Sequence, residues 1–316
     1  MTEPGREPIP YITRWRQSTD VWLDRLRAAM PDERVVPFAQ LSEAERGAVR
    51  VAIVADPDPA ELAALPALEW VQSTWAGVER MLAELPPAIG IARMVDPRLA
   101  ETMGEAVLTA ILWLHRDGPR YARQQREREW RHAHFVRPER RTVGVLGLGA
   151  LGRAAAERLV ANGFAVMGWS RTQKAIPGID ARSGTQGLRA VLGASDIVVN
   201  LLPHTPGTER LLDASALAAM PAGASLVNFG RGATVDEAAL LDALDRGRLA
   251  HAFLDVFETE PLPENHPFWA HERVTVWPHV SAPTDADSAS LVVADAIAEW
   301  RVSGTQPPLV DRARGY

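Results

Sequence analysis

The segment VGVLGLGALG at residues 143–152 constrains the fold more than any other part of this chain. An apolar run that predicts a strand leads into it, and a helical pattern follows it. Between them the glycines stand in GxGxxG spacing, at Gly147, Gly149 and Gly152. In this context they permit, in order, a tight turn, a close backbone approach to a pyrophosphate and close packing of helix on strand. We therefore expect a dinucleotide site, with the helix N-terminal residues Ala150 and Leu151 facing the phosphates.

Apolar runs that predict strands alternate with helical patterns along the whole chain. In the first hundred residues the runs lie at 10–13, 34–38, 49–54, 70–74 and 92–95. After Arg141, six runs lie at 143–146, 164–169, 197–201, 225–228, 250–254 and 274–277. Long helices are expected over residues 100–116 and 285–300. This alternation predicts an α/β fold with doubly wound parallel sheets.

The length of 316 residues suits two domains, since a domain typically has roughly 100–200 residues. The last helical pattern is expected to leave the second sheet and pack on the first. We therefore expect a discontinuous substrate domain, residues 1–98 plus 285–316, with an inserted dinucleotide-binding domain, residues 99–284. Both domains are expected to be Rossmann-like.

Charge and composition exclude several classes of protein. The 34 Lys and Arg against 40 Asp and Glu argue against a constitutive nucleic-acid binder. Residues 116–141 are dense in Arg but interleaved with Glu, so a solvated helix or a subunit-contact arm is favoured. The lack of cysteine excludes disulfides, a thiol nucleophile and a Cys-ligated metal, and no metal site is expected. The apolar stretch Ala106–Leu114 is too short to span a bilayer and no secretory signal is visible, so we expect a cytoplasmic protein without membrane contact.

The segment WSRTQK at residues 169–174 bears on the choice of cofactor. An NAD site usually has an acidic residue about 20 residues after the glycines, which binds the ribose 2′-hydroxyl. Here no acidic residue occurs between Glu157 and Asp180. The residues that would instead bind a 2′-phosphate are Ser170, Arg171, Thr172 and Lys174. We expect NADP(H) to be preferred, with NAD(H) possible.

Polar residues follow three successive predicted strands of the second domain. Arg231 lies in NFGRG, Asp255 in LDVFETEP with Glu260 after it, and His279 in WPHVSA. Ligands bind at the carboxyl ends of such strands. An Arg, a Glu and a His beside a nicotinamide suffice to reduce a carbonyl. The His donates the proton, the Glu raises its pKa, and the Arg holds a substrate carboxylate and polarises the carbonyl.

These motifs together resemble the D-isomer-specific 2-hydroxyacid dehydrogenases, and most closely the A-type glyoxylate/hydroxypyruvate reductases. The resemblance covers nearly the whole chain, including LLPHTPGT, HPFWAHERVTVWPH and the terminal VDRARGY. It implies that Arg231 is the substrate-binding catalytic Arg, His279 the general acid/base and Glu260 its partner. The implied cofactor contacts are Asp255 at the nicotinamide carboxamide, Leu202 and Pro203 on the adenosine side, and Phe229 and Gly230 near the nicotinamide.

The segment STWAGVE at residues 73–79 resembles the family's substrate loop. The resemblance implies that backbone N–H groups of Ala76 and Gly77 bind the substrate carboxylate. Trp75 stands where glycine is common, so it either lines the pocket or packs in the core. The reaction implied is NADPH-dependent reduction of glyoxylate to glycolate and of hydroxypyruvate to D-glycerate, in the interdomain cleft of a homodimer.

Three alternatives stay open. The first is a broader D-2-hydroxyacid dehydrogenase that acts on larger 2-oxo acids, including aromatic ones. The second is a nucleotide-sensing binding protein that keeps the fold without turnover, although all three reacting residues are retained in this chain. The third is nucleic-acid binding through residues 116–141, which would make the affinity sensitive to salt.

Overall fold

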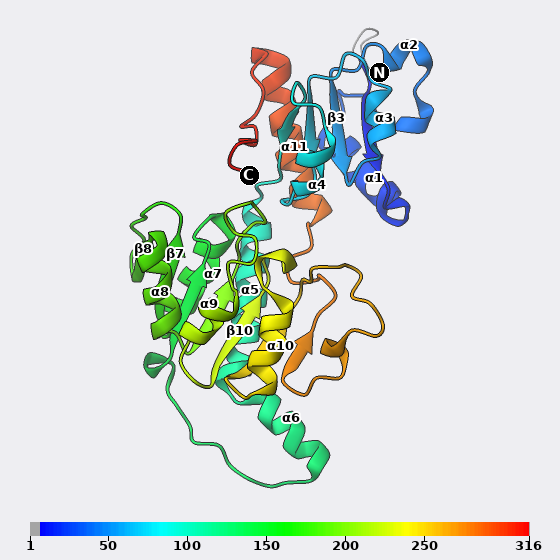
Figure 1. The fold of residues 1–316 in the computed structure, drawn as a ribbon. Helices are drawn as coiled ribbons and strands as arrows, with labels where there is room; N and C mark the ends of the chain where they lie inside the picture. The colour runs from blue at the N-terminus through cyan, green and yellow to red at the C-terminus, as the bar shows by residue number, and fades with distance from the viewer. Residues whose placement is uncertain (1–6, 316) are drawn as a thin grey trace. The chain divides into compact units, whose positions relative to one another are not determined.

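The computed structural model describes residues 7–315, with the side chain of Arg16 left out. The chain divides into two compact units, each an α/β sheet structure (Figure 1). The first unit comprises Met1–Arg98 and Thr284–Tyr316, and the second comprises Leu99–Pro283. The expected fold class, α/β with two Rossmann-like parallel sheets, is confirmed. Among the described residues, no helix combines the length and apolar character that crossing a membrane requires.

The first unit contains a five-stranded parallel sheet in the order β2-β1-β3-β4-β5. Its strands are β1 (Ile9–Thr13), β2 (Val35–Pro37), β3 (Val51–Ala55), β4 (Trp70–Ser73) and β5 (Gly90–Ala92). Its helices are α1 (Thr19–Ala29), α2 (Glu43–Arg46), α3 (Pro59–Ala63), α4 (Glu79–Glu84) and α11 (Ala286–Ser303). Every residue of β3 is buried, because its alternate side chains enter two different cores. One core includes residues of α1 and α11, and the other includes residues of α3 and α4.

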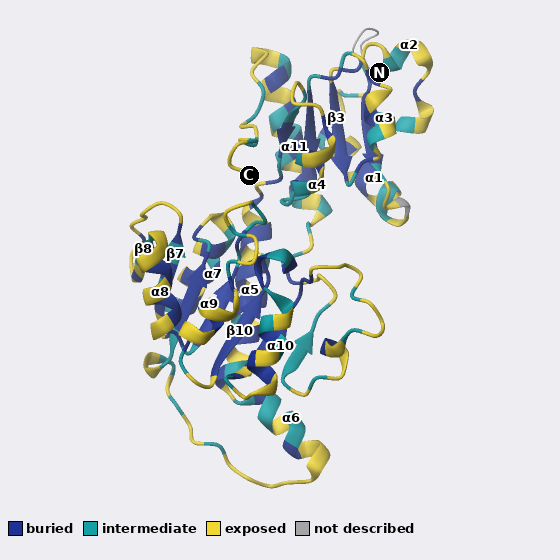
Figure 2. Cartoon of the chain, viewed as in Figure 1, coloured by how far each residue is buried: buried dark blue, intermediate teal, exposed yellow. Residues whose placement is uncertain are grey.

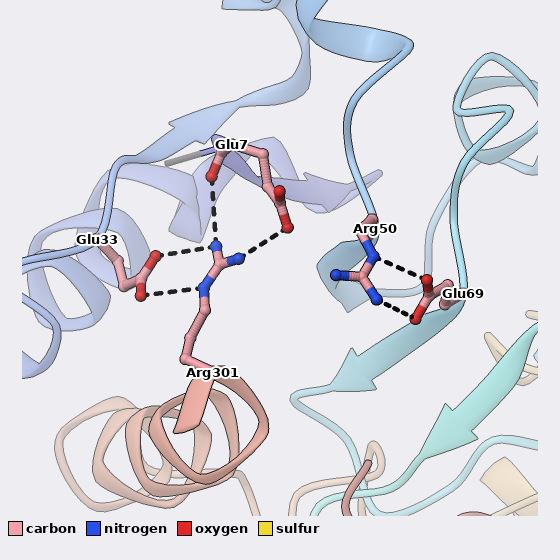
Figure 3. Close-up of polar contacts among 5 residues, drawn as sticks. All are labelled: Glu7, Glu33, Arg50, Glu69 and Arg301. Atoms are coloured by element: carbon pink, nitrogen blue, oxygen red, sulfur yellow. Dashed lines mark hydrogen bonds and ion pairs between the residues drawn. The ribbon is translucent and has the colours of Figure 1, made fainter. Parts of the chain in front are cut away.

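The last helix is held in the first unit by a partly buried ion-pair cluster (Figure 3). Arg301 on α11 donates to the carboxylate of Glu7 at 2.7 Å and to that of Glu33 at 3.1 and 3.2 Å. Ser288, near the start of α11, donates to Asp96 at 2.6 Å. Helix α11, near the C-terminal end of the chain, therefore packs on a sheet whose strands all come from the N-terminal part.

The second unit contains a seven-stranded sheet in the order β12-β11-β10-β9-β6-β7-β8, with all neighbouring strands parallel. Its strands are β6 (Thr142–Leu146), β7 (Ala165–Ser170), β8 (Ile179–Ser183), β9 (Ile197–Asn200), β10 (Ala224–Asn228), β11 (Leu249–Leu254) and β12 (Val274–Val276). Its helices are α5 (Pro97–His115), α6 (Gly118–Glu127), α7 (Ala150–Ala161), α8 (Gly184–Ala194), α9 (Ala214–Ala219) and α10 (Glu237–Asp245). The strand order reverses direction between β6 and β9, and such a switch point is where open α/β sheets bind ligands. Figure 2 shows the central strands buried and the outer helix faces exposed.

The expectation of six strands in this part of the chain was wrong, because β8 is a seventh. Its sequence is IDARS, and only Ile179 is both apolar and buried. Asp180 and Arg182 point out of the sheet and pair with each other. An edge strand with charged side chains lacks the apolar run by which buried strands are recognised. In the first unit, the strand expected at 92–95 lies earlier, at Gly90–Ala92.

The Arg-rich segment forms α6 followed by a long stretch without helix or strand, which ends at a short 3-10 turn at Pro138–Arg140 (Figure 1). Most of its charged side chains are exposed. The stretch also exposes Trp130 and Phe135, at 93% and 60%. The expected solvated helix is present, and the exposed aromatic side chains are an additional feature.

Candidate active site

The glycine loop lies at the switch point, between β6 and α7. Gly147 has φ +98°, and a Cβ there would lie 2.9 Å from the carbonyl oxygen of Leu201. A Cβ on Gly152 would lie 1.7 Å from the carbonyl oxygen of Gly147, so α7 packs on the loop only with glycine there. By contrast, a Cβ on Gly149 would meet nothing within 4 Å. The open space over Gly149, at the N-terminus of α7, fits a pyrophosphate that approaches the backbone amides.

The segment Ser170–Lys174 lies beside this loop, because β7 pairs with β6 up to Trp169. The ammonium of Lys174 donates to the carbonyl oxygen of Leu148 at 2.7 Å, which ties the segment to the glycine loop. The Ser170 hydroxyl donates to the carbonyl oxygen of Thr172 at 2.8 Å. Arg171 and Thr172 are exposed. The residues expected at a 2′-phosphate therefore lie together at the carboxyl end of β7.

Glycines bring together the loops that follow β9, β10 and β11. A Cβ on Gly232 would lie 1.8 Å from the backbone carbon of Phe257, and one on Gly230 would lie 2.7 Å from the carbonyl oxygen of Leu202. The two glycines on either side of Arg231 thus allow backbone-to-backbone contact with both neighbouring loops. This contact carries Arg231 toward the loop that bears Glu260.

His279 and Glu260 form a direct pair. Nδ1 of His279 lies 2.7 Å from Oε2 of Glu260, and Oε1 of the same carboxylate accepts from the backbone N–H of Phe257 at 2.9 Å. This orientation leaves Nε2 as the ring nitrogen that can exchange a proton with a substrate.

The pKa values of the pair diverge in the direction that acid–base catalysis needs. The hydrogen bond to Glu260 raises the pKa of His279 above its ordinary value, although partial burial and the positive charge of Arg231 lower it. Burial raises the pKa of Glu260, but hydrogen bonds from His279 and Phe257 outweigh it and hold the pKa below its ordinary value. Because the charge of Arg231 lowers both pKa values, all three expected catalytic residues lie within electrostatic range of one another.

Asp255 holds the backbone on which His279 stands. Its carboxylate is fully buried and accepts from the backbone N–H groups of Val280 at 2.7 Å and Ser281 at 3.0 Å. Its carbonyl oxygen accepts from the N–H of His279, which has a left-handed backbone with φ +54°. Few residues other than glycine adopt this conformation, and it persists where surrounding bonds enforce it. Both carboxylate oxygens of Asp255, the residue expected at the nicotinamide carboxamide, thus accept hydrogen bonds from the chain itself.

Three further expected cofactor contacts lie nearby and are buried or partly buried. The side chain of Phe229 packs in the core, stacked on Trp277 with ring centroids 5.6 Å apart, so only its backbone faces the loop region. Leu202 is also buried. The carbonyl oxygen of Pro203 accepts from the hydroxyl of Thr208 at 2.6 Å, which fixes the turn after β9.

The loop at Trp75–Gly77 belongs to the first unit, where it follows β4. The hydroxyl of Ser73 bonds both the N–H and the carbonyl oxygen of Trp75 at 3.0 Å, which makes a tight local turn. The Trp75 ring is partly buried against the core and meets the edge of Trp15, with centroids 6.2 Å apart. Trp75 therefore has both a core side and an exposed side. Ala76 and Gly77 are partly exposed.

One group of residues at this end of the second sheet was not expected from the sequence. Asn200, Asn228 and Thr234 are all buried and hydrogen-bonded to one another around the Arg231 loop. The available signal was a polar residue at the end of two apolar strands, IVVN and SLVN. That signal is equally typical of a strand that runs into a turn.

A seven-stranded parallel sheet with a glycine loop at its switch point and a His–Glu pair near an Arg defines a nicotinamide-nucleotide oxidoreductase. Residues 108–281 match the family model described as D-isomer specific 2-hydroxyacid dehydrogenase, NAD binding domain. The chain belongs to the D-isomer specific 2-hydroxyacid dehydrogenases, and the resemblance seen in the sequence is confirmed.

Related proteins and solved structures agree with this family. The chain is 35% identical to glyoxylate/hydroxypyruvate reductase A of Serratia proteamaculans, over 95% of this chain and 97% of the relative. A D-isomer specific 2-hydroxyacid dehydrogenase from Xanthobacter autotrophicus, solved with NADPH and MES, is 38% identical with a TM-score of 0.92, over 99% of this chain and 100% of that one. An NADPH-dependent glyoxylate/hydroxypyruvate reductase from Sinorhizobium meliloti, solved with NADP and sulfate, is 33% identical with a TM-score of 0.91, over 98% and 100%.

Proposed function

We propose that this protein reduces small 2-oxo acids with NADPH, converting glyoxylate to glycolate and hydroxypyruvate to D-glycerate. The observation that carries the proposal is the 2.7 Å pair of His279 and Glu260, with the charge of Arg231 acting on both. The relatives from Serratia proteamaculans and Sinorhizobium meliloti carry the names of enzymes for this reaction.

In the proposed mechanism, Arg231 binds the substrate carboxylate and polarises the adjacent carbonyl. Backbone amides of Ala76 and Gly77, in the loop that resembles the family's substrate loop, are proposed as further substrate contacts. Bound NADPH supplies the hydride to the carbonyl carbon. As negative charge develops on the oxygen, His279 donates a proton from Nε2, and Glu260 stabilises the imidazolium before that transfer.

The protein's own groups also hold the cofactor in this proposal. The pyrophosphate binds at the amides of the glycine loop, and the 2′-phosphate binds at the exposed Arg171 with its neighbours up to Lys174. The remaining cofactor contacts proposed are backbone or side-chain groups of Leu202, Pro203, Phe229, Gly230 and Asp255. NADPH is therefore preferred over NADH. Arg171→Asp should reverse or abolish that preference, and an unchanged ratio of NADPH to NADH efficiency would contradict the phosphate site.

The test of the whole proposal is a set of initial rates with glyoxylate, hydroxypyruvate, pyruvate and phenylpyruvate, each with NADPH and with NADH. Fast NADPH-dependent turnover of the first two acids is expected. Faster turnover of phenylpyruvate would point instead to a broader dehydrogenase for larger 2-oxo acids. Tight NADPH binding without any turnover would point to a nucleotide sensor.

We further propose that the protein works as a homodimer in the cytoplasm, the compartment that supplies NADPH. The support for a dimer is the apolar exposure on α5, α6 and the stretch after them, where Trp113, Trp130 and Phe135 are 43%, 93% and 60% exposed. Beside Tyr121 and Trp130 the surface is polar, with Gln125, Arg128 and Glu129. Exposed aromatic side chains are enriched at subunit contacts. The solution mass should be that of two chains, and Trp130→Ala should shift it toward one.

A further inference from the structure

A chain of buried hydrogen bonds ends on the backbone of Arg231. The side-chain amide of Asn200 donates one N–H to Oδ1 of Asn228 at 2.9 Å and the other to the hydroxyl of Thr234 at 2.6 Å. The Thr234 hydroxyl then donates its own proton to the carbonyl oxygen of Arg231 at 2.6 Å. The side-chain amide of Asn228 donates to the same carbonyl oxygen at 3.2 Å.

The directions of these hydrogen bonds fix which group donates and which accepts at each position. Asn200 uses both N–H groups, so Thr234 must accept from it and can donate only to Arg231. The oxygen of Asn200 accepts from the backbone N–H of Leu202 at 3.3 Å, and that of Asn228 accepts from the N–H of Gly230 at 3.3 Å. A buried network in which the polar groups are hydrogen-bonded is rigid, because the loss of any bond leaves a buried polar group without a partner.

The network is also buried throughout. Asn200 and Thr234 have no exposed surface, and Asn228 is 2% exposed. Asn200 and Asn228 end two adjacent strands, β9 and β10, whereas Thr234 comes from the turn after Arg231. The rigid ends of the sheet are thus joined through Thr234 to a loop residue that must be held in one place.

We propose that Asn200, Asn228 and Thr234 are positioning residues that fix Arg231 for the substrate carboxylate. This inference rests on the proposed function, in which Arg231 binds the 2-oxo acid. The network bonds to the backbone carbonyl of Arg231, while the guanidinium of Arg231 donates to the carbonyl oxygen of Gly230 at 2.8 Å. Loss of the network therefore weakens the use of the 2-oxo acid while NADPH is still bound.

The test compares two substitutions of Thr234 that differ in one hydroxyl. Thr234→Val keeps the shape and removes the central link, and Thr234→Ser keeps the link. Thr234→Val should lower kcat/KM for glyoxylate by about tenfold or more, since small misplacements of a substrate-orienting group are costly. The Kd for NADPH should change by less than about twofold, and Thr234→Ser should restore most of kcat/KM. Asn228→Asp, which removes the other donor to the Arg231 carbonyl, should lower kcat/KM in the same way if Thr234→Val folds poorly.

A matched control separates positioning from general loss of stability. Ser195 is another fully buried hydroxyl that donates to a backbone carbonyl oxygen, that of Val191, at 2.6 Å. Ser195→Ala should lower the melting temperature as Thr234→Val does but leave kcat/KM unchanged. Introduced into an Arg231→Ala background, Thr234→Val should have almost no further effect on kcat/KM, because it acts through Arg231.

The results of these experiments distinguish a failure of the positioning role from a failure of the proposed function. If the wild-type protein turns over glyoxylate and Thr234→Val has the kcat/KM of Thr234→Ser, the positioning role is wrong and the proposed function stands. An equal further loss in the Arg231→Ala background would also overturn the positioning role. If the wild-type protein reduces neither glyoxylate nor hydroxypyruvate, the proposed function and the positioning role fall together.

Discussion

The negative charge of the Glu260 carboxylate determines the pH up to which His279 stays protonated. Since the hydrogen bond to Glu260 raises the pKa of His279, Glu260→Gln should lower it. Reduction needs protonated His279, so the alkaline limb of kcat/KM against pH should move to lower pH. The measurement is kcat/KM for glyoxylate at saturating NADPH across the pH range. An alkaline limb that stays in place would show that His279 is not the titrating acid.

The pair of His279 and Glu260 also stabilises the folded protein, by an amount that depends on pH. The raised pKa of His279 gives stabilisation that is complete below its ordinary value of 6.5 and is lost as the pH rises through the folded value. The lowered pKa of Glu260 gives stabilisation that is complete above its ordinary value of 4.5 and is lost as the pH falls. The pair should therefore contribute most between about pH 4.5 and 6.5. Glu260→Gln should lower the melting temperature most inside that window and reduce its fall on either side.

Asp255 is the residue for which geometry and family resemblance differ most. If its main task is to hold the backbone of His279, Asp255→Asn should cost about a hundredfold in kcat, because one of the two amides then faces a donor. The Kd for NADPH should stay within about threefold of the wild-type value. Asp213→Asn is the control, since its carboxylate accepts from a backbone amide at the start of α9 instead. A change confined to NADPH affinity would favour the nicotinamide carboxamide as the partner of Asp255.

At the scale of the element, the glycine loop offers a matched pair of substitutions. Gly152→Ala should lower both stability and NADPH affinity, because its Cβ would overlap the carbonyl of Gly147. This loss would oppose the gain of roughly 1 kcal/mol that alanine usually gives within a helix. Gly149→Ala should keep the melting temperature and weaken NADPH binding alone, because its Cβ points into open space. Wild-type affinity in Gly149→Ala would remove the pyrophosphate from that position.

Elements with a strong period were predictable from the sequence, and those without one were not. Most strands of the two sheets were predicted because each is a short apolar run, such as VAIVA, too short for a typical helix. Strand β8 was missed because its stability comes from pairing with β7, while its side chains are largely polar. Arg231, Asp255 and His279 were expected at the carboxyl ends of strands, and they lie just after β10, β11 and β12. The bond from Asn200 to the Thr234 hydroxyl and the bond from Lys174 to Leu148 were not expected, because contacts between residues distant in sequence leave no local pattern.

At the scale of the whole molecule, the first unit depends on its last helix. Arg301→Met would leave Glu7 and Glu33 without their shared cation, at a cost of about 3 kcal/mol in the free energy of unfolding. Arg246→Met, which breaks the exposed pair with Asp242, should cost less than about 0.5 kcal/mol. Urea unfolding of both variants measures the difference. Equal values would mean that the Arg301 cluster is as weak as a surface pair.

The position of α11 in the first unit has a consequence for synthesis on the ribosome. The strands β1–β5 emerge first, yet the apolar face that α11 covers stays open until about three hundred residues have been made. The second unit is one continuous segment of the chain, so it can fold before the first unit is complete. The nascent chain therefore carries an unfinished domain through most of its translation. During that time Trp22, Trp70 and the other residues of that core lack the cover that α11 gives them in the folded protein.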